Sequence, residues 1–310
     1  MRPFPSAALV AFAWILGGAA TSAWAQAEDR DDVDLLDRDG LASREGAAAA
    51  EAPDLRTMLG LVECRSGPWV CLLRGALRKD GLGLSGVHLG RAELGLPRAN
   101  TATTFEIALR LPGGGRLVGD LFDFGLRGQT VPGKSISFGG TPLQVGQPLA
   151  TGLRLTGGVV VARYPIVGGP DHRLDWDAGL QLVRARVAMT QPELRLTTTA
   201  LSPFVVLGVH SYHRLGAWGP GPVVAETTLQ TGHWAPLGIG SHQRNWSLRL
   251  RVALRIPLAR LAAEPDAPAT ASLVLEYTYE FLDQERFRHV DKRDIDLELH
   301  GPQLALAAAF

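Results

Sequence analysis

Residues 246–258 of the chain read WSLRLRVALRIPL, and this alternation decides the class of fold. Apolar side chains occupy every even position, whereas the odd positions carry Arg249, Arg251 and Arg255 among smaller residues. A helix would scatter the leucines around its circumference, so a period of two predicts a β-strand. The 13 residues also suffice to cross a bilayer, which takes roughly 9–11 residues at the tilt of a barrel strand.

The same alternation recurs from residue 82 to the end of the chain. It predicts strands near residues 84–94, 102–111, 115–127, 148–164, 172–187, 199–213, 222–231, 245–260, 270–283 and 294–310. An even number of strands is typical of single-chain bacterial barrels. We therefore expect an all-β fold, an antiparallel transmembrane β-barrel of about ten strands (eight to twelve), with a short N-terminal helical or irregular segment.

The connections between these strands alternate in length. Compact turns are predicted at Pro112–Gly114, Pro165–Asp171, Arg214–Gly221 and Leu261–Ala269, and longer loops at residues 128–147, 188–198, 232–244 and 284–293. Short turns on the inner side of a membrane and long loops on the outer side are typical of a transmembrane barrel.

The final strand combines an apolar alternation with a change of phase. Leu304, Leu306 and Phe310 occupy even positions, whereas Leu297 and Leu299 occupy odd ones. Because glycine tolerates bulge geometry and proline cannot donate a ladder hydrogen bond, we expect a bulge at Gly301-Pro302. Leu304, Leu306 and Phe310 resemble the signal that the barrel assembly machinery reads, which makes that machinery a predicted partner.

The chain divides into four predicted parts. Residues 1–25 resemble a cleaved signal peptide, with an apolar run and a small-x-small motif at Ala23-Trp24-Ala25, although an uncleaved anchor is the alternative. Residues 26–54 carry ten acids against three arginines and are interpreted as a disordered linker, or else a docking tail for a basic partner. Residues 55–80 form a separate N-terminal segment, and residues 81–310 form the barrel in the outer membrane.

Two cysteines lie within that N-terminal segment. Cys64 and Cys71 flank Arg65-Ser66-Gly67-Pro68, whose glycine and proline favour a turn. In an oxidising periplasm the pair is expected to close a small disulfide loop, the alternative being two free thiols. The closed segment could then pack at the periplasmic mouth as a helix or enter the lumen as a plug.

Several short motifs carry a family resemblance. They are Ala92-Glu93-Leu94-Gly95-Leu96, Ile136-Ser137-Phe138-Gly139-Gly140-Thr141, Pro148-Leu149-Ala150, Pro203-Phe204-Val205-Val206-Leu207-Gly208 and His300-Gly301-Pro302-Gln303-Leu304-Ala305-Leu306. With them the chain resembles a family of ten-stranded outer-membrane β-barrels of unknown function from environmental bacteria. The resemblance implies a barrel in the outer membrane and brings no catalytic residues.

Charged residues on two adjacent strands form the best polar constellation. Arg249, Arg251 and Arg255 should face the lumen together with Glu276 and Glu280 of the next strand. Opposite charges on neighbouring strands pair and fill a narrow barrel. Two interpretations stay open: a charged constriction in a small pore, and a closed interior that makes the barrel rigid.

Catalysis and metal binding receive less support. His210-Ser211-Tyr212-His213 supplies a nucleophile and bases for a lipid hydrolase, but Ser211 and His213 should share one face while His210 takes the other. Asp171, His172, Asp175 and Asp177 cluster at a turn without the spacing of a known metal loop. The sequence implies no cofactor, and the scattered arginines form no stripe for nucleic acid.

These observations favour an outer-membrane protein with a structural or small-pore role and no enzymatic activity. Outer-membrane lipid is the expected surrounding, and no feature indicates an oligomeric state. The alternatives are a lipid-modifying hydrolase that uses Ser211, and a soluble periplasmic β-sandwich that binds a ligand and buries its leucine faces against each other.

Overall fold

The computed structural model describes residues 62–79, 89–219, 221–234, 242–260, 270–288 and 291–310, which belong to one compact unit, residues 52–310. The predicted signal peptide and acidic linker lie outside the described residues. No helix in this described part has the length and apolarity that a membrane-spanning helix needs.

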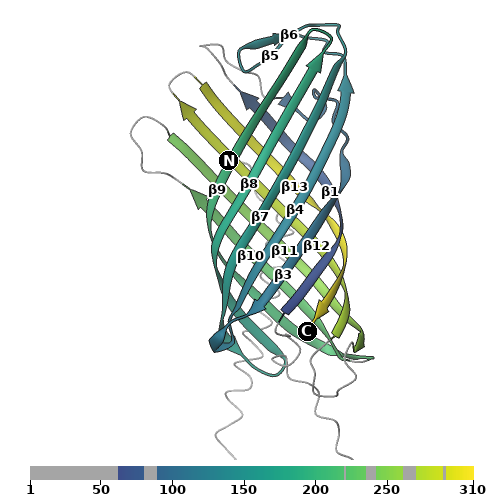
Figure 1. The fold of residues 1–310 in the computed structure, drawn as a ribbon, viewed down its shortest axis with the longest axis vertical. Coiled ribbons are helices and arrows are strands. Elements are labelled where there is room, and N and C mark those ends of the chain that lie inside the picture. Colours follow the sequence, from purple (N-terminus) through teal and green to yellow (C-terminus); the bar gives the residue numbers. More distant parts are fainter. Residues whose placement is uncertain (1–61, 80–88, 220, 235–241, 261–269, 289–290) are drawn as a thin grey trace, which may run out of the picture. The chain divides into compact units, whose positions relative to one another are not determined.

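The described chain forms a closed antiparallel β-barrel of ten long strands (Figure 1). They are β1 (Val62–Lys79), β3 (Ala99–Arg110), β4 (Arg116–Thr130), β7 (Leu149–Gly168), β8 (His172–Gln191), β9 (Leu194–Trp218), β10 (Gly221–Trp234), β11 (His242–Arg260), β12 (Thr270–Arg288) and β13 (Asp291–Ala309). Each strand pairs with the next one along the chain, and β13 pairs with β1. The predicted all-β fold with ten barrel strands is confirmed.

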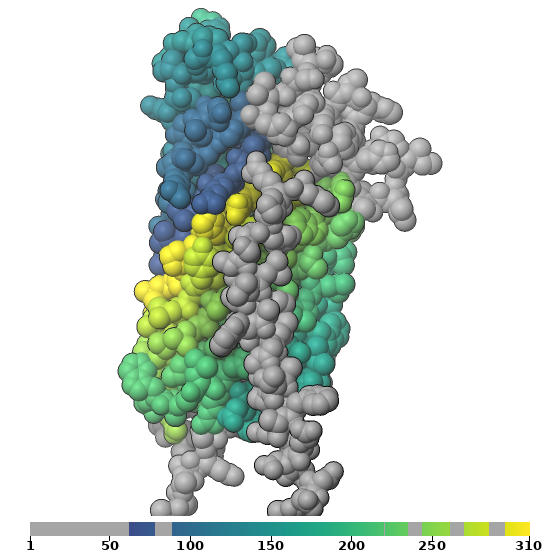
Figure 2. Space-filling model, turned by 180° about the vertical axis from the view of Figure 1, so that it is seen from behind, coloured from purple at the N-terminus to yellow at the C-terminus, as the bar shows by residue number. Residues whose placement is uncertain are grey.

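The seam between the first and last strands closes the barrel. The register runs from Glu63 opposite Ala309 to Lys79 opposite Arg293, and Figure 2 shows β1 in purple-blue directly beside β13 in yellow. Two backbone hydrogen bonds between Val62 and Phe310, at 3.1 and 2.8 Å, complete the ladder. Closure removes the exposed edges that an open sheet would present.

Apolar side chains form much of the outer surface of the barrel, although β4, β7 and the distal half of β13 also carry apolar side chains inward. Leu180 and Leu306 are each 64% exposed and Leu207 is 58% exposed. The inward positions alternate with these and are mostly buried. A β-sandwich would instead bury the leucine faces against each other, so that alternative is wrong.

The prediction for residues 55–80 is also wrong where the structure describes them. Residues 62–79 form β1, which belongs to the barrel, and of the predicted strand 84–94 only the two-residue strand β2 (Leu89–Gly90) is extended in the described part. Gly67-Pro68 continues the strand, and a Cβ at position 67 would lie 2.0 Å from the carbonyl oxygen of Leu304 on β13. The glycine therefore permits close pairing with β13 and does not mark a turn.

The two cysteines are free, which contradicts the predicted disulfide. Cys64 and Cys71 lie seven residues apart in β1 and on opposite faces of the sheet. Seven residues of extended strand span about 23 Å. A disulfide requires Cα atoms within about 7 Å, so the fold of β1 excludes this bond.

The strands extend into regions that were predicted to be loops. β8 and β9 continue through most of residues 188–198 and are joined by a turn at residues 192–193. The predicted compact turn at Pro112–Gly114 is present as a short 3-10 helix, η1. The barrel wall is thus tallest where a long loop was expected.

The predicted bulge at Gly301-Pro302 is absent from β13, which is described throughout. Pairing with β12 continues without a shift through Thr278 opposite Gly301 and Tyr277 opposite Pro302. Leu297 and Leu299 face inward and are buried, whereas Leu304 and Leu306 face outward. The change of phase in the sequence marks a change in the interior from apolar to polar, and not a bulge.

The barrel interior has two zones. We call the end that carries Val62 and Phe310 the terminal end and the opposite end the distal end. The distal interior is an apolar core that includes Trp69, Phe124, Leu155, Met189, Phe204 and Leu299. Leu94 and Leu96 of the β2–β3 connection and the hairpin of β5 (Ile136–Phe138) and β6 (Thr141–Leu143) add to this core. The interior toward the terminal end is lined by charged side chains.

Candidate functional site

All five charged residues singled out in the sequence face the barrel interior. Arg251 pairs with Glu276 on the neighbouring strand (Nε to Oε1, 2.9 Å), and Arg249 pairs with Glu280 (NH2 to Oε2, 3.2 Å). Arg255 differs, because it pairs with Glu226 of β10 at 2.7 Å and with Glu63 of β1. The side chains of all five are at most 13% exposed.

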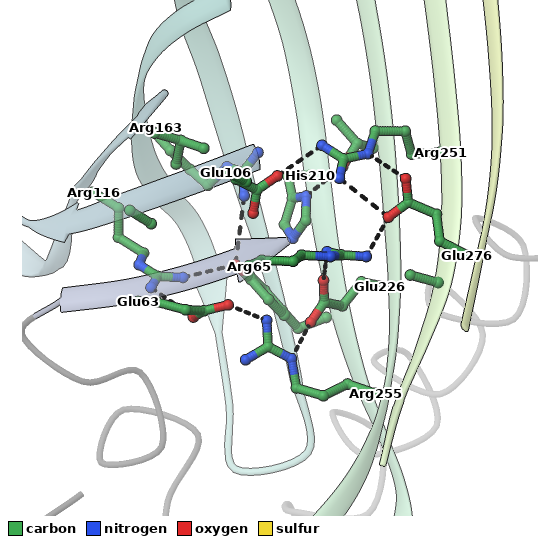
Figure 3. Close-up of a pocket in the computed structure, with 15 residues that line it drawn as sticks. Glu63, Arg65, Glu106, Arg116, Arg163, His210, Glu226, Arg251, Arg255 and Glu276 are labelled. Carbon is green, nitrogen blue, oxygen red and sulfur yellow. Dashed lines mark hydrogen bonds and ion pairs between the residues drawn. The ribbon is translucent and has the colours of Figure 1, made fainter. Parts of the chain in front are cut away.

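The ion pairs form one continuous network that Figure 3 shows. Arginines and carboxylates alternate along it in the order Arg116, Glu63, Arg255, Glu226, Arg65, Glu276, Arg251, Glu106. Each charged residue within the series therefore has two neighbours of opposite charge, and the two terminal residues, Arg116 and Glu106, have one each. Buried charges require such pairing, since an unpaired one costs several kcal/mol.

The network also spans the lumen between strands that are not neighbours. Arg251 of β11 donates to Glu106 of β3 at 2.8 Å, and Arg249 donates to Asp120 of β4 at 2.9 Å. The second contact joins residues 129 positions apart in the chain. These bridges fix opposite walls of the barrel relative to each other.

A second cluster extends the network to β7, β8 and β9. Arg163 holds Asp177 with two hydrogen bonds, at 2.8 and 3.0 Å. The hydroxyl of Tyr212 accepts from Arg116 at 3.3 Å and from Arg163 at 3.5 Å. Gln230 of β10 donates to Asp177 at 2.8 Å. Tyr212 thus links the second cluster to the first.

Little space remains between these side chains. Two cavities that they line each have a volume of about 20 Å³, room for roughly one water molecule. The buried Nε atoms of Arg65, Arg116 and Arg249 and the Nε2 atom of His210 have no hydrogen-bond partner among the described residues. The volume of each cavity leaves no room for a ligand larger than a water molecule.

The candidate hydrolase residues are divided between the two faces of β9. Ser211 and His213 lie on the face of β9 opposite to His210, as the alternation predicts, although Ser211 is only 8% exposed. His210 points inward, is 4% exposed, and its Nδ1 lies 2.6 Å from the hydroxyl of Thr228. Among the described residues Ser211 makes no hydrogen bond to an imidazole, since His210 contacts Thr228 on the other face, and a serine nucleophile needs such a base beside it.

The candidate metal-binding aspartates are engaged by arginines. Asp177 binds Arg163, and Asp175 pairs with Arg173 at 2.7 Å. Both carboxylates face inward and are at most 1% exposed. Asp171 is exposed at the turn and lies 3.9 Å from Arg214. Among the described residues no group of three or more His, Cys, Asp or Glu side chains could hold a metal ion.

Several residues of the network were missed in the sequence. Glu63 and Arg65 escaped because their segment was interpreted as a disulfide loop, although both occupy odd positions together with Trp69. Glu106 and Asp120 sit at inward positions of strands that the alternation did predict. A search for charged residues at inward positions of every strand would have found these two.

The fold and interior define a closed ten-stranded antiparallel β-barrel with a charged and nearly filled lumen. No protein-family model and no curated protein sequence matches the chain. Among solved structures it is similar to the outer membrane protease OmpT from Escherichia coli, with 11% identity over 80% of this chain and 97% of that chain and a TM-score of 0.46.

Two autotransporter structures are also similar to the chain. The transport unit of AIDA-I from Escherichia coli has 8% identity over 86% of this chain and 93% of that chain, with a TM-score of 0.35. The beta domain of the Bordetella autotransporter BrkA has 12% identity over 79% of this chain and 99% of that chain, with a TM-score of 0.29.

Proposed function

We propose that the chain is a bacterial outer-membrane β-barrel whose role is structural, with a closed lumen and no enzymatic activity. The outward apolar surface supports the membrane location. On β9 the outward row from Leu201 to Val209 is apolar, and Leu180 of the neighbouring strand is 64% exposed. Exposure of such a large apolar surface to water is unfavourable, whereas contact with the hydrocarbon chains of a bilayer is favourable.

Outward aromatic pairs lie toward both edges of this apolar surface. Tyr164 stacks on Trp176 near the terminal end with ring centroids 5.9 Å apart, and Trp246 contacts Phe281 nearer the distal end at 5.1 Å. Aromatic side chains favour the two interfaces of a bilayer. The pairs therefore support a membrane that surrounds the barrel between these levels. We propose that the terminal end faces the periplasm, because it carries short turns such as Pro112–Gly114, and short turns are typical of the periplasmic side.

The observation that carries the structural role is the ion-pair network across the lumen. To open a passage, Arg249 and Arg251 would have to leave Asp120 and Glu106 on the opposite wall. The two arginines would keep Glu280 and Glu276, but the carboxylates of Asp120 and Glu106 would lose their partners, and breaking a buried pair costs about 3–5 kcal/mol. The apolar core at the distal end adds a second barrier, because ions do not enter a dry hydrocarbon-like interior.

The outward end of β13 fits recognition by the assembly machinery. Leu304 is 49% exposed, Leu306 is 64% exposed and Phe310 is 55% exposed. The three side chains share the outer face and are free to contact another protein before insertion. We propose that they are read during assembly, and the double substitution Leu306→Ser/Phe310→Ser should then lower the amount inserted without changing synthesis.

Two measurements test the proposed function. Heat-modifiable migration of the protein from the membrane fraction tests the location, and recovery only in the soluble periplasmic extract would overturn it. Planar-bilayer recordings of the refolded chain test the closed lumen. We expect no channel activity above the empty-bilayer background, and the same for Arg251→Ala. Stable channels whose ion selectivity changes in Arg251→Ala would replace the structural role with a pore.

A further inference from the structure

A one-sided group of arginines covers the outer wall of the barrel above its apolar surface. We call it the arginine patch, and it consists of Arg127 on β4, Arg154 on β7, Arg184 and Arg186 on β8, and Arg195 on β9. All five side chains are exposed and lie at outward positions of four consecutive strands. These strands are described throughout, so the composition of their outer face is complete.

The patch begins where the apolar surface ends. On β8 the outward row changes from Leu180 and Leu182 directly to Arg184 and Arg186. Leu182 is 49% exposed, and the neighbouring Leu201 on β9 is 54% exposed. In a bilayer that covers the leucines, the arginines would therefore lie at the level of the lipid head groups on the distal side.

The patch is not neutralised by the protein. Asp123 is the single carboxylate at an outward position of β4, β7, β8 and β9, and it binds Arg154 through both oxygens at 2.6 and 3.0 Å. Arg154 is also the direct cross-strand partner of Arg186. Like charges directly opposite each other are destabilising. The other four arginines form no ion pair with any described residue; they are Arg127, Arg184, Arg186 and Arg195.

We propose that the arginine patch binds the phosphate groups of outer-leaflet lipids, a glycolipid with more than one phosphate in particular. This rests on the proposed placement of the barrel in the outer membrane. Guanidinium groups bind phosphate bidentately, and several arginines on one outer face suit a head group with several phosphates. The acyl chains of the same lipid would lie along Leu180, Leu182 and Leu201, which continue the patch toward the terminal end.

Native mass spectrometry of the full chain in a neutral detergent tests this proposal. The probe is a bisphosphorylated lipid A-type glycolipid, compared with its dephosphorylated form and with inorganic phosphate as competitor. The variant is Arg184→Gln/Arg186→Gln, and the matched control is Arg110→Gln/Arg260→Gln, which removes two exposed arginines at the terminal end. Both doubles must migrate as heat-modifiable barrels before binding is measured.

We expect the wild-type chain and the control to bind the phosphorylated lipid with equal affinity. The Arg184→Gln/Arg186→Gln variant should bind it about tenfold more weakly or worse, since two charge-assisted contacts are lost. The dephosphorylated lipid should bind all three proteins as weakly as that variant binds the phosphorylated one. Equal binding by variant and control overturns the proposal, and so does competition by inorganic phosphate at the concentration of the lipid. A folded barrel in the membrane fraction with either result leaves the proposed function intact.

Discussion

The indole Nε1–H of Trp69 on β1 donates to the carbonyl oxygen of Gly301 on β13 at 3.1 Å. The contact spans the seam that closes the barrel, and Trp69 itself is 2% exposed within the distal core. Trp69 therefore contributes both to the closure of the barrel and to the packing of its interior. The absence of a side chain at position 301 makes this possible, because a Cβ there would lie 1.9 Å from the carbonyl oxygen of Val70.

Gly301→Ala should therefore open the seam. The added Cβ meets backbone, which cannot move aside as a flexible side chain would, and the φ of +154° is one that other residues rarely adopt. We expect a loss of about 2–3 kcal/mol or more of unfolding free energy. Urea unfolding of the barrel refolded in lipid vesicles measures it. Gly168→Ala, at a position with no atom within 4 Å, is the control and should change the value by less than about 0.5 kcal/mol.

Glu63 is the carboxylate that joins Arg116 and Arg255 at the start of the ion-pair network. Glu63→Gln keeps the shape of the side chain but removes its charge. The buried guanidinium groups of Arg116 and Arg255 then each lose one ion pair. We expect a loss of about 3–5 kcal/mol in the same unfolding experiment. Asp123→Asn is the matched control, since it breaks an ion pair whose side chains are 47% and 64% exposed.

The control should cost no more than about 1 kcal/mol, because solvent screens an exposed pair. Comparable losses for the two substitutions would mean that the interior is hydrated and that the network does not hold the walls together. A small loss for both would contradict the structural role more directly than any conductance measurement.

The sequence predicted most of the wall of this barrel. The alternation in residues 246–258 predicts β11 and its inward arginines. Successive side chains of a barrel strand point to opposite faces, so here one row faces outward and the other faces the charged interior. It failed for β1, whose Gly67-Pro68 reads locally as a turn. Only the contact of position 67 with Leu304 of the last strand shows why glycine is required there, and no local pattern contains that contact.

The interior network was predicted only in part, because some of its contacts join strands that are distant in the sequence. Arg251 and Glu276 lie on adjacent strands, so their pairing follows from register alone. The contact of Arg249 with Asp120 depends on the size of the closed barrel, which brings β11 opposite β4. The change of phase in β13 predicts a bulge from the backbone properties of Gly301-Pro302 alone, and the local sequence does not show which medium fills the distal interior. Leu297 and Leu299 instead face an apolar interior.

Leu180 tests whether a bilayer surrounds the apolar surface. Its side chain is 64% exposed near the middle of the outward apolar rows of β8 and β9. Leu180→Arg should lower the stability in lipid vesicles by about 2–4 kcal/mol, the cost of a basic side chain near the midplane. Thr197→Arg on β9 is the control, since this outward position lies beyond the apolar row and should cost no more than about 1 kcal/mol. Equal effects of the two substitutions would place the apolar surface outside the hydrocarbon.

The two thiols report on the placement of β1. Cys71 is 0% exposed in the distal core, whereas Cys64 faces outward and is partly exposed. We expect two reactive thiols per chain when the protein is unfolded without a reductant, because β1 holds the sulfur atoms too far apart to bond. In the folded barrel the Cys64→Ser variant, which keeps only Cys71, should resist a maleimide that labels the Cys71→Ser variant. Thiols that become reactive only after reduction would restore the disulfide loop and remove residues 62–79 from the barrel wall.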